Sequence, residues 1–155
     1  EIFSVLLPME VELVENPVEG LCVQRGPVVY SYAIPMDCVE DTVVYDYLAG
    51  KVSANPDFKC WNMTPSGKWN YALVKDRLDE VKVELTGSAG YPFDLDNAPV
   101  KISVPVVGVK DWTLDEDRYT PALPDEVVAE SEEVTFIDLV PYGSTTLRLT
   151  TFPVY

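Results

Sequence analysis

The chain has 155 residues, of which 47% are hydrophobic, and a chain of this length can bury one substantial core. Its 26 acidic residues against 11 basic ones give a net charge of -15, which repels phosphate backbones and anionic lipid headgroups. No apolar run reaches the roughly 20 residues that a membrane-spanning helix needs. We therefore expect neither nucleic acid nor membrane among its partners.

Short segments that alternate polar and apolar residues, or that are rich in β-branched and aromatic side chains, dominate the chain, as is typical of β-strands. The predicted strands are 9–14, 21–25, 28–34, 58–63, 69–74, 81–85, 100–107, 134–140 and 145–152. Turn-forming residues such as Gly26-Pro27 separate them. We predict an all-β fold, an antiparallel, jelly-roll-like β-sandwich that forms a single domain over residues 1–155.

Helical patterns are scarce, and only 41–48 and 75–83 have room for a turn or two of helix. The stretch 115–133 is acidic and contains two prolines, which is typical of a long surface loop. Pro105 lies within the predicted strand 100–107, where it cannot donate a ladder hydrogen bond. This predicts that the strand lies at a sheet edge or carries a bulge.

The last two predicted strands are separated by Pro141-Tyr142-Gly143-Ser144, a sequence that favours a turn, so we predict a terminal β-hairpin. In the second arm, alternation places Leu147, Leu149 and Thr151 on the face toward the core. Arg148 and Phe152 then belong to the opposite face.

Residues for catalysis are hard to find in this sequence. There is no histidine, which removes Ser-His, Cys-His and His-metal mechanisms. No phosphate-binding glycine motif and no Gly-x-Ser-x-Gly motif occurs either. We therefore predict no catalytic residue and no cofactor in this chain.

Neighbouring carboxylates remain as candidates, because a glycosidase needs only two carboxyl groups that flank a sugar ring. The candidate groups are Asp94 with Asp96, Asp115 with Glu116 and Asp117, and Glu132 with Glu133. With 26 acidic residues in the chain, solvated loops explain such clusters better. Asp94 to Asn97 also resembles part of a calcium loop, but an Asx turn is the preferred interpretation and no metal site is predicted.

Aromatic side chains offer flat surfaces that can stack on sugar rings. The candidates for such stacking are Tyr45, Tyr47, Tyr91 and Trp61, and we expect the three tyrosines to be exposed because they lie in loosely patterned segments. Trp69 follows a Pro-Ser-Gly-Lys turn, and we expect it to anchor the core. The three cysteines have no disulfide or zinc spacing, which predicts three buried thiols or, as the alternative, one disulfide with a spare thiol.

Three segments, 24–30, 68–73 and 134–153, together resemble the C-terminal β-sandwich domain of the bacterial β-L-arabinofuranosidase-like glycoside hydrolases, a family formerly described as a domain of unknown function. Within these segments the residues predicted to have a structural role are Arg25, Gly26, Pro27, Trp69, Asn70, Tyr71, Pro141, Tyr142, Gly143 and Arg148. Arg25 favours a structural pairing that holds the following turn, with an interdomain contact as the alternative. The stretch 36–57 departs from the pattern of the family.

The resemblance implies an accessory domain without catalytic activity. In that family an (α/α)6 barrel holds the catalytic glutamate and the zinc-binding cysteines, and none of these residues matches a position of this chain. We expect the chain to be the excised C-terminal part of a larger bacterial glycoside hydrolase, where it packs on the barrel and has the neighbouring domains as partners.

Two other functions stay open at this stage. One is a carbohydrate-binding module, for which the mark would be a coplanar pair of exposed aromatic rings beside Asp or Asn oxygens. The other is an independent structural or adhesion-type domain, for which the mark would be self-association. A periplasmic, an extracellular and a bacterial cytoplasmic location all agree with the sequence.

Overall fold

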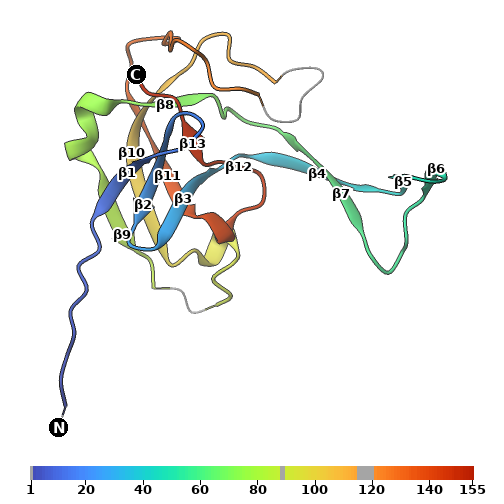
Figure 1. The fold of residues 1–155 in the computed structure, drawn as a ribbon, viewed down its shortest axis with the longest axis horizontal. Coiled ribbons are helices and arrows are strands. Elements are labelled where there is room, and N and C mark those ends of the chain that lie inside the picture. Colours follow the sequence, from blue (N-terminus) through green and yellow to red (C-terminus); the bar gives the residue numbers. More distant parts are fainter. Residues whose placement is uncertain (1, 88–89, 115–120) are drawn as a thin grey trace. The chain divides into compact units, whose positions relative to one another are not determined.

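The computed structural model describes residues 2–87, 90–114 and 121–155. Contacts divide the chain into two compact units, one formed by Glu1–Ala33 with Asn70–Tyr155 and the other by Ile34–Trp69. The regular elements are antiparallel strands with three short 3-10 helices (Figure 1), so the predicted all-β antiparallel fold is confirmed. None of the helices within the described residues is long and apolar enough to cross a membrane.

The first unit is built on one curled sheet with the strand order β1-β2-β3-β11-β10-β8. Three further strands pair with members of this row: β9 with β10, β12 with β3, and β13 with β2. The strands are β1 (Val11–Glu15), β2 (Leu21–Arg25), β3 (Val28–Ala33), β8 (Tyr71–Leu73), β9 (Lys82–Leu85), β10 (Val100–Gly108), β11 (Thr135–Pro141), β12 (Arg148–Leu149) and β13 (Thr151–Phe152).

The predicted terminal hairpin is wrong. Leu139 of β11 and Leu149 of β12 both pair with Tyr32 of β3, and because a strand residue has one neighbour on each edge, β11 and β12 flank β3 instead of pairing with each other. The 3-10 turn η3 (Tyr142–Ser144) begins the crossing. Arg148 fixes this crossing, since its guanidinium donates to the carbonyl oxygens of Tyr142 and Thr145.

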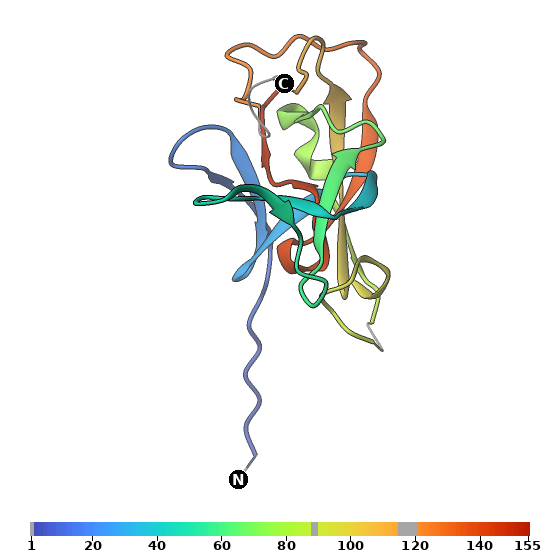
Figure 2. The ribbon, with the colours of Figure 1, turned by 90° about the vertical axis from the view of Figure 1, so that its right-hand side faces the viewer.

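The end of the chain joins β2, next to one end of the strand order, to β8 at the other end. After β13 pairs with β2, the carbonyl of Pro153 accepts from the amide of Leu73 at 3.0 Å, and the amide of Tyr155 donates to the carbonyl of Leu73 at 2.9 Å. In Figure 2 the red C-terminal segment accordingly runs between the blue strands and the orange and gold strands. Leu73 belongs to β8, so one short segment connects β2 with the opposite end of the strand order.

The core lies inside this curl. Val23, Leu73, Ile102, Leu139 and Phe152 are fully buried and form one apolar cluster. The burial of Phe152 corrects the predicted face pattern, because the alternation is interrupted at Thr150, between β12 and β13. Residues on the two sides of such a break do not share one register.

Pro105 lies in the interior of the sheet and not at the predicted edge. It stands opposite Phe136 of β11, in a register with no bulge, while the other side of β10 pairs with β9 through Ser103 and with β8 through Val106. The carbonyl of Pro105 accepts from the amide of Val74 on that other side, and N and C=O of a strand residue point to the same edge. The missing N–H therefore falls in the gap between β9 and β8, where no ladder bond is lost.

The predicted helical turns have different outcomes. Residues 75–80 form the 3-10 helix η1 (Lys75–Glu80), in which Arg77 Nε donates to Glu80 Oε1 at 2.5 Å. The pKa of the Glu80 carboxyl is lowered by this hydrogen bond with Arg77. Residues 41–48 form no helix, because they contain a strand at 43–46 that leads into a turn. A third short helix, η2 (Leu95–Asn97), precedes β10.

The second unit is a pair of two-stranded ribbons. β4 (Met36–Asp41) pairs with β7 (Cys60–Pro65), and β5 (Val43–Asp46) pairs with β6 (Gly50–Ser53). Only β7 corresponds to a predicted strand. Asp46 Oδ1 accepts from the amides of Leu48 and Ala49, and Gly50 has a φ of +75°, so the hairpin turn is defined by its own sequence.

Candidate functional site

The predicted sugar-stacking residues lie in both units. Tyr45, Tyr47 and Trp61 are 79%, 91% and 48% exposed in the second unit, and Tyr91 is 67% exposed in the first. The predicted exposure of the tyrosines is confirmed. A role in sugar binding stays a prediction.

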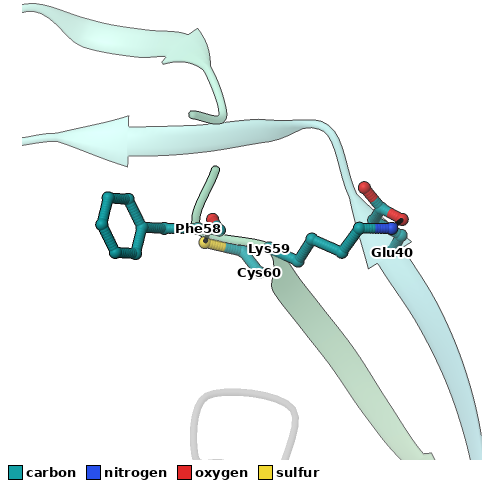
Figure 3. A network of polar contacts seen from close by, with 4 residues as sticks. All are labelled: Glu40, Phe58, Lys59 and Cys60. Atoms are coloured by element: carbon teal, nitrogen blue, oxygen red, sulfur yellow. Dashed lines mark hydrogen bonds and ion pairs between the residues drawn. The ribbon is translucent and has the colours of Figure 1, made fainter. Parts of the chain in front are cut away.

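Trp61 belongs to a polar cluster on the β4–β7 ribbon. Its cross-strand neighbour is Glu40, whose Oε2 lies 2.8 Å from Lys59 Nζ (Figure 3). The same ammonium lies 5.6 Å from the centroid of the Trp61 ring. A sugar that stacks on this ring would therefore meet a cation that is already paired with a carboxylate.

Tyr91 forms a ring pair with Phe93 that is not coplanar. The two centroids are 5.4 Å apart and the planes meet at 63°. Aromatic edges and faces attract in this geometry, but the two rings do not form one flat surface. The mark expected of a carbohydrate-binding module is therefore absent from this pair.

The first unit contains an open pocket with a volume of about 810 Å³. Its lining comes from separate stretches of the first unit and is mostly apolar. The lining residues are Met9, Asn16, Cys22, Arg25, Pro27, Val28, Val29, Tyr30, Pro92, Phe93, Pro99, Val100, Pro141, Tyr142, Gly143, Ser144, Thr150 and Thr151.

Half of the residues predicted to have a structural role meet at this pocket, namely Arg25, Pro27, Pro141, Tyr142 and Gly143. Two more, Gly26 and Arg148, lie against residues of the lining. An added Cβ on Gly26, which has a φ of +57°, would lie 3.0 Å from Met9 Sδ, and the guanidinium of Arg148 lies 3.8 Å from the centroid of the Tyr142 ring.

Close contacts fix the wall of the pocket around η3. Ser144 is buried, and its hydroxyl donates to the carbonyl of Pro92 at 2.7 Å. A Cβ added to Gly143 would come within 2.9 Å of the Phe93 ring. The position of the Phe93 ring therefore requires a glycine at position 143. This contact joins the loop before β10 to the turn after β11.

Arg25 is the one charged residue of the lining. It is half-buried, and its side chain has no hydrogen-bond or ion-pair partner among residues 2–87, 90–114 and 121–155. The predicted structural pairing of Arg25 is therefore not observed there. The chain contains 26 acidic residues, and none of those that the structure describes lines the pocket.

The remaining motif residues lie outside the pocket lining. Asn70 Nδ2 donates to the carbonyl of Val109 at 2.5 Å and to Glu130 Oε1 at 3.1 Å. Tyr71 packs edge-on against Tyr32, with centroids 5.5 Å apart. Trp69, which was expected to anchor the core, is half-buried. Trp112 is the tryptophan that is buried, and its indole N–H donates to the carbonyl of Ala122.

The structure describes two of the three groups of acidic candidates. Asp94 Oδ1 accepts from the amide of Asp96 at 2.9 Å, so the predicted Asx turn is confirmed. Glu132 and Glu133 are exposed, whereas Asp115, Glu116 and Asp117 lie outside the described residues. The described residues contain no group of three potential metal ligands among Asp, Glu, Cys and His.

The prediction of three buried thiols is wrong for two of the cysteines. Cys38 and Cys60 are exposed, Cys22 is half-buried, and all three are free. Cys38 stands opposite Met63 and Cys60 opposite Asp41, which places the two sulfurs on opposite faces of the β4–β7 ribbon. They are therefore not placed to form a disulfide with each other.

Some pocket residues were not found from the sequence. Phe93 and Pro99 are isolated apolar residues beside turns, where no periodicity distinguishes them, and Met9 was predicted only as the first residue of the strand 9–14. The short run Tyr91-Pro92-Phe93 was the one sequence signal for this part of the pocket. Two aromatic residues in a loop have no strand that would bury them, so they are candidates for a surface site. Comparisons of the chain with protein-family models, with curated proteins and with solved structures find no match.

Proposed function

We propose that this chain is a non-catalytic accessory β-domain of a multidomain glycoside hydrolase that resembles the bacterial β-L-arabinofuranosidases. In this role it packs on the (α/α)6 catalytic barrel and stabilises it. The observation that carries the proposal is the convergence of the motif residues Arg25, Pro27, Pro141, Tyr142 and Gly143 on one apolar pocket.

The chemistry of the pocket supports a protein partner. Phe93 and Tyr142 are 63% and 49% exposed, and Met9 is 46% exposed. Large contiguous patches of exposed apolar residues are rare on soluble proteins, and where they occur they commonly mark interaction sites. The absence of carboxylates from the lining removes the charge that opposes apolar packing over the rest of this acidic surface.

The motif residues support a role in shape and not in chemistry. Gly26 and Gly143 are held against Met9 and Phe93, and Arg148 holds the η3 turn through two backbone carbonyls. None of these contacts brings together a nucleophile, an acid and a base. They keep the pocket wall in one conformation, as an interdomain surface requires.

The test compares the longer polypeptide with a form that lacks residues 1–155. We expect the deletion to lower the melting temperature and the rate of hydrolysis of arabinofuranosides, because the barrel loses an apolar contact. A deletion that leaves stability and activity unchanged would reject the proposal.

Binding of carbohydrate is the second candidate function, and the exposure of Tyr45, Tyr47 and Trp61 favours it. Calorimetric titration with arabinose- and galactose-containing oligosaccharides, with and without calcium, tests it on the isolated chain. Saturable heat that is lost in Tyr47→Ala would support this function. No heat at millimolar sugar would exclude it as the role of these residues.

A further inference from the structure

Residues 2–7, the N-terminal apolar segment, are extended and almost fully exposed. Ile2, Phe3, Val5, Leu6 and Leu7 have exposed fractions of 100%, 85%, 76%, 90% and 71%. Figures 1 and 2 show this segment extending away from the strands of the curled sheet. Such a run of exposed large apolar side chains is costly in water, at about 25 cal/mol for each Å² of apolar surface.

The alternation of the segment differs from that of the strand that follows. In an extended chain, Phe3, Val5 and Leu7 share one face, and Ile2 and Leu6 lie with Ser4 on the other. In β1 (Val11–Glu15), by contrast, only one face is apolar toward the core, through Val11 and Leu13, whereas Glu12 and Val14 on the other face are exposed. A strand that is apolar on both faces is typical of a sheet covered on both sides.

The backbone of the segment is unpaired as well. Within the described parts of the chain, no strand pairs with residues 2–7 and none of their amides or carbonyls makes a hydrogen bond. Pro8 separates the segment from β1 and has no N–H to continue the ladder. The segment therefore presents six residues of free backbone, about the length of an average strand.

We propose that residues 2–7 are a β-strand that adds to the edge of a sheet in a neighbouring β-domain of the same polypeptide, between apolar layers on both faces. This inference rests on the proposed function, because it needs the longer polypeptide, and it adds a second neighbour, since a helical barrel has no sheet edge to which a strand can add. Met9, two residues after the segment, lines the apolar pocket. A neighbour that pairs with the segment is thereby brought to the rim of the pocket.

Charge argues against a second copy of this chain as the partner. Residues 2–7 carry no charged side chain, but each copy carries a net charge of -15. Two copies joined through so short a segment would repel each other. A neighbouring domain on the same polypeptide avoids the entropic cost of association between separate molecules.

Hydrogen exchange measured by mass spectrometry tests this inference. The peptide that contains residues 2–7 is followed in the isolated chain and in the longer polypeptide. We expect fast exchange in the isolated chain and, in the longer polypeptide, exchange slowed on the order of 100-fold or more, as in a stable sheet. Equal rates in both would overturn the inference.

A matched pair of variants separates strand addition from simple apolar contact. Val5→Pro removes one N–H and Val5→Thr keeps it while retaining the β-branched shape. In the longer polypeptide, Val5→Pro should restore fast exchange, whereas Val5→Thr should keep most of the protection. In the isolated chain both variants should leave the melting temperature unchanged, because Val5 is already exposed.

The outcomes separate this inference from the proposed function. If deletion of residues 1–155 destabilises the longer polypeptide but residues 2–7 exchange fast in it, the accessory role stands and the strand addition is wrong. If the isolated chain dimerises in sedimentation experiments, and Val5→Pro abolishes the dimer, the partner is a second copy and the neighbouring-domain assignment is overturned.

Discussion

The two units of this chain use the same strand pairing with opposite results for burial. In the first unit, Val23, Leu73, Ile102 and Phe152 are completely buried inside the curled sheet. In Ile34–Trp69, all of which the structure describes, no residue is buried, although four strands are paired there. Strand pairing satisfies the backbone, but only closure of a sheet over a second surface buries side chains.

Closure in the first unit comes from its last residues. Phe152 enters the core, and Pro153 and Tyr155 bond to Leu73 of β8. On the β4–β7 ribbon, by contrast, Met36, Cys38 and Trp61 share one face and remain exposed. We therefore expect the first unit to contain most of the stability of the isolated chain, and the second to depend on whatever it contacts.

The two units should differ most in how much the free energy of unfolding falls when a phenylalanine in each is replaced by alanine. Phe152→Ala removes a fully buried ring and should lower the free energy of unfolding by about 3–5 kcal/mol. Phe58→Ala removes a ring that is 74% exposed, and its effect should stay within about 0.5 kcal/mol. Denaturant unfolding of both variants measures this, and equal losses would mean that the ribbon has a core of its own.

Two glycines with the same backbone conformation provide a finer comparison. Gly20 and Gly50 have φ values of +74° and +75°, so alanine at either position costs about 1–2 kcal/mol of backbone strain. A Cβ on Gly20 would also lie 2.5 Å from Leu123 Cδ1 and 2.7 Å from the carbonyl oxygen of Phe152, whereas Gly50 has open space around it.

Gly20→Ala should therefore cost about 1–3 kcal/mol more than Gly50→Ala, because it adds overpacking to the strain. Denaturant unfolding of the two variants, with wild type as the reference, gives this difference directly. Equal losses would show that the β1–β2 turn is packed no more tightly than the hairpin of the second unit.

The smallest effect concerns a tyrosine of the first unit. Burial raises the pKa of the Tyr32 hydroxyl, with Tyr71 as a further cause through charge and a hydrogen bond. Because the folded pKa lies above the unfolded value of 10.0, the contribution of Tyr32 to stability is complete below that pH and is lost as pH rises through the folded pKa.

Ultraviolet titration of tyrosinate should detect this group. In Tyr71→Phe the pKa of Tyr32 should fall toward the ordinary value without reaching it, because burial is the larger cause. A full return to the ordinary value would make Tyr71, and not burial, the main cause. The difference between the two titrations contains the loss of the Tyr71 signal as well as the shift of Tyr32, because all nine tyrosines absorb when ionised.

The strands of the first unit were largely predictable from the sequence. β2 has the predicted bounds, and β3 and β10 end within one residue of them, because alternation between clear turn residues defines both ends. The strands β4, β5 and β6 were missed, since their exposed faces carry too few apolar residues for a period to emerge.

Long-range features were not predictable in the same way. A turn sequence at 141–144 predicts a hairpin, but the choice between pairing with β11 and crossing β3 depends on strands more than a hundred residues away. The pocket shows the same limit. The lining residues Arg25 and Tyr142 belong to motifs that the sequence analysis had identified. Phe93 lies in a loop with no sequence pattern, so its place in the lining could not be predicted.

The proposed accessory role requires that the pocket face contacts a neighbouring domain. The most direct measurement compares Phe93→Glu with Phe58→Glu, two charge insertions at phenylalanines that are 63% and 74% exposed, in the isolated chain and in the longer polypeptide. We predict that both melt like wild type in the isolated chain and that only Phe93→Glu lowers the melting temperature of the longer polypeptide. If Phe93→Glu has no effect there, or if Phe58→Glu has the same effect, the pocket face is not the contact surface.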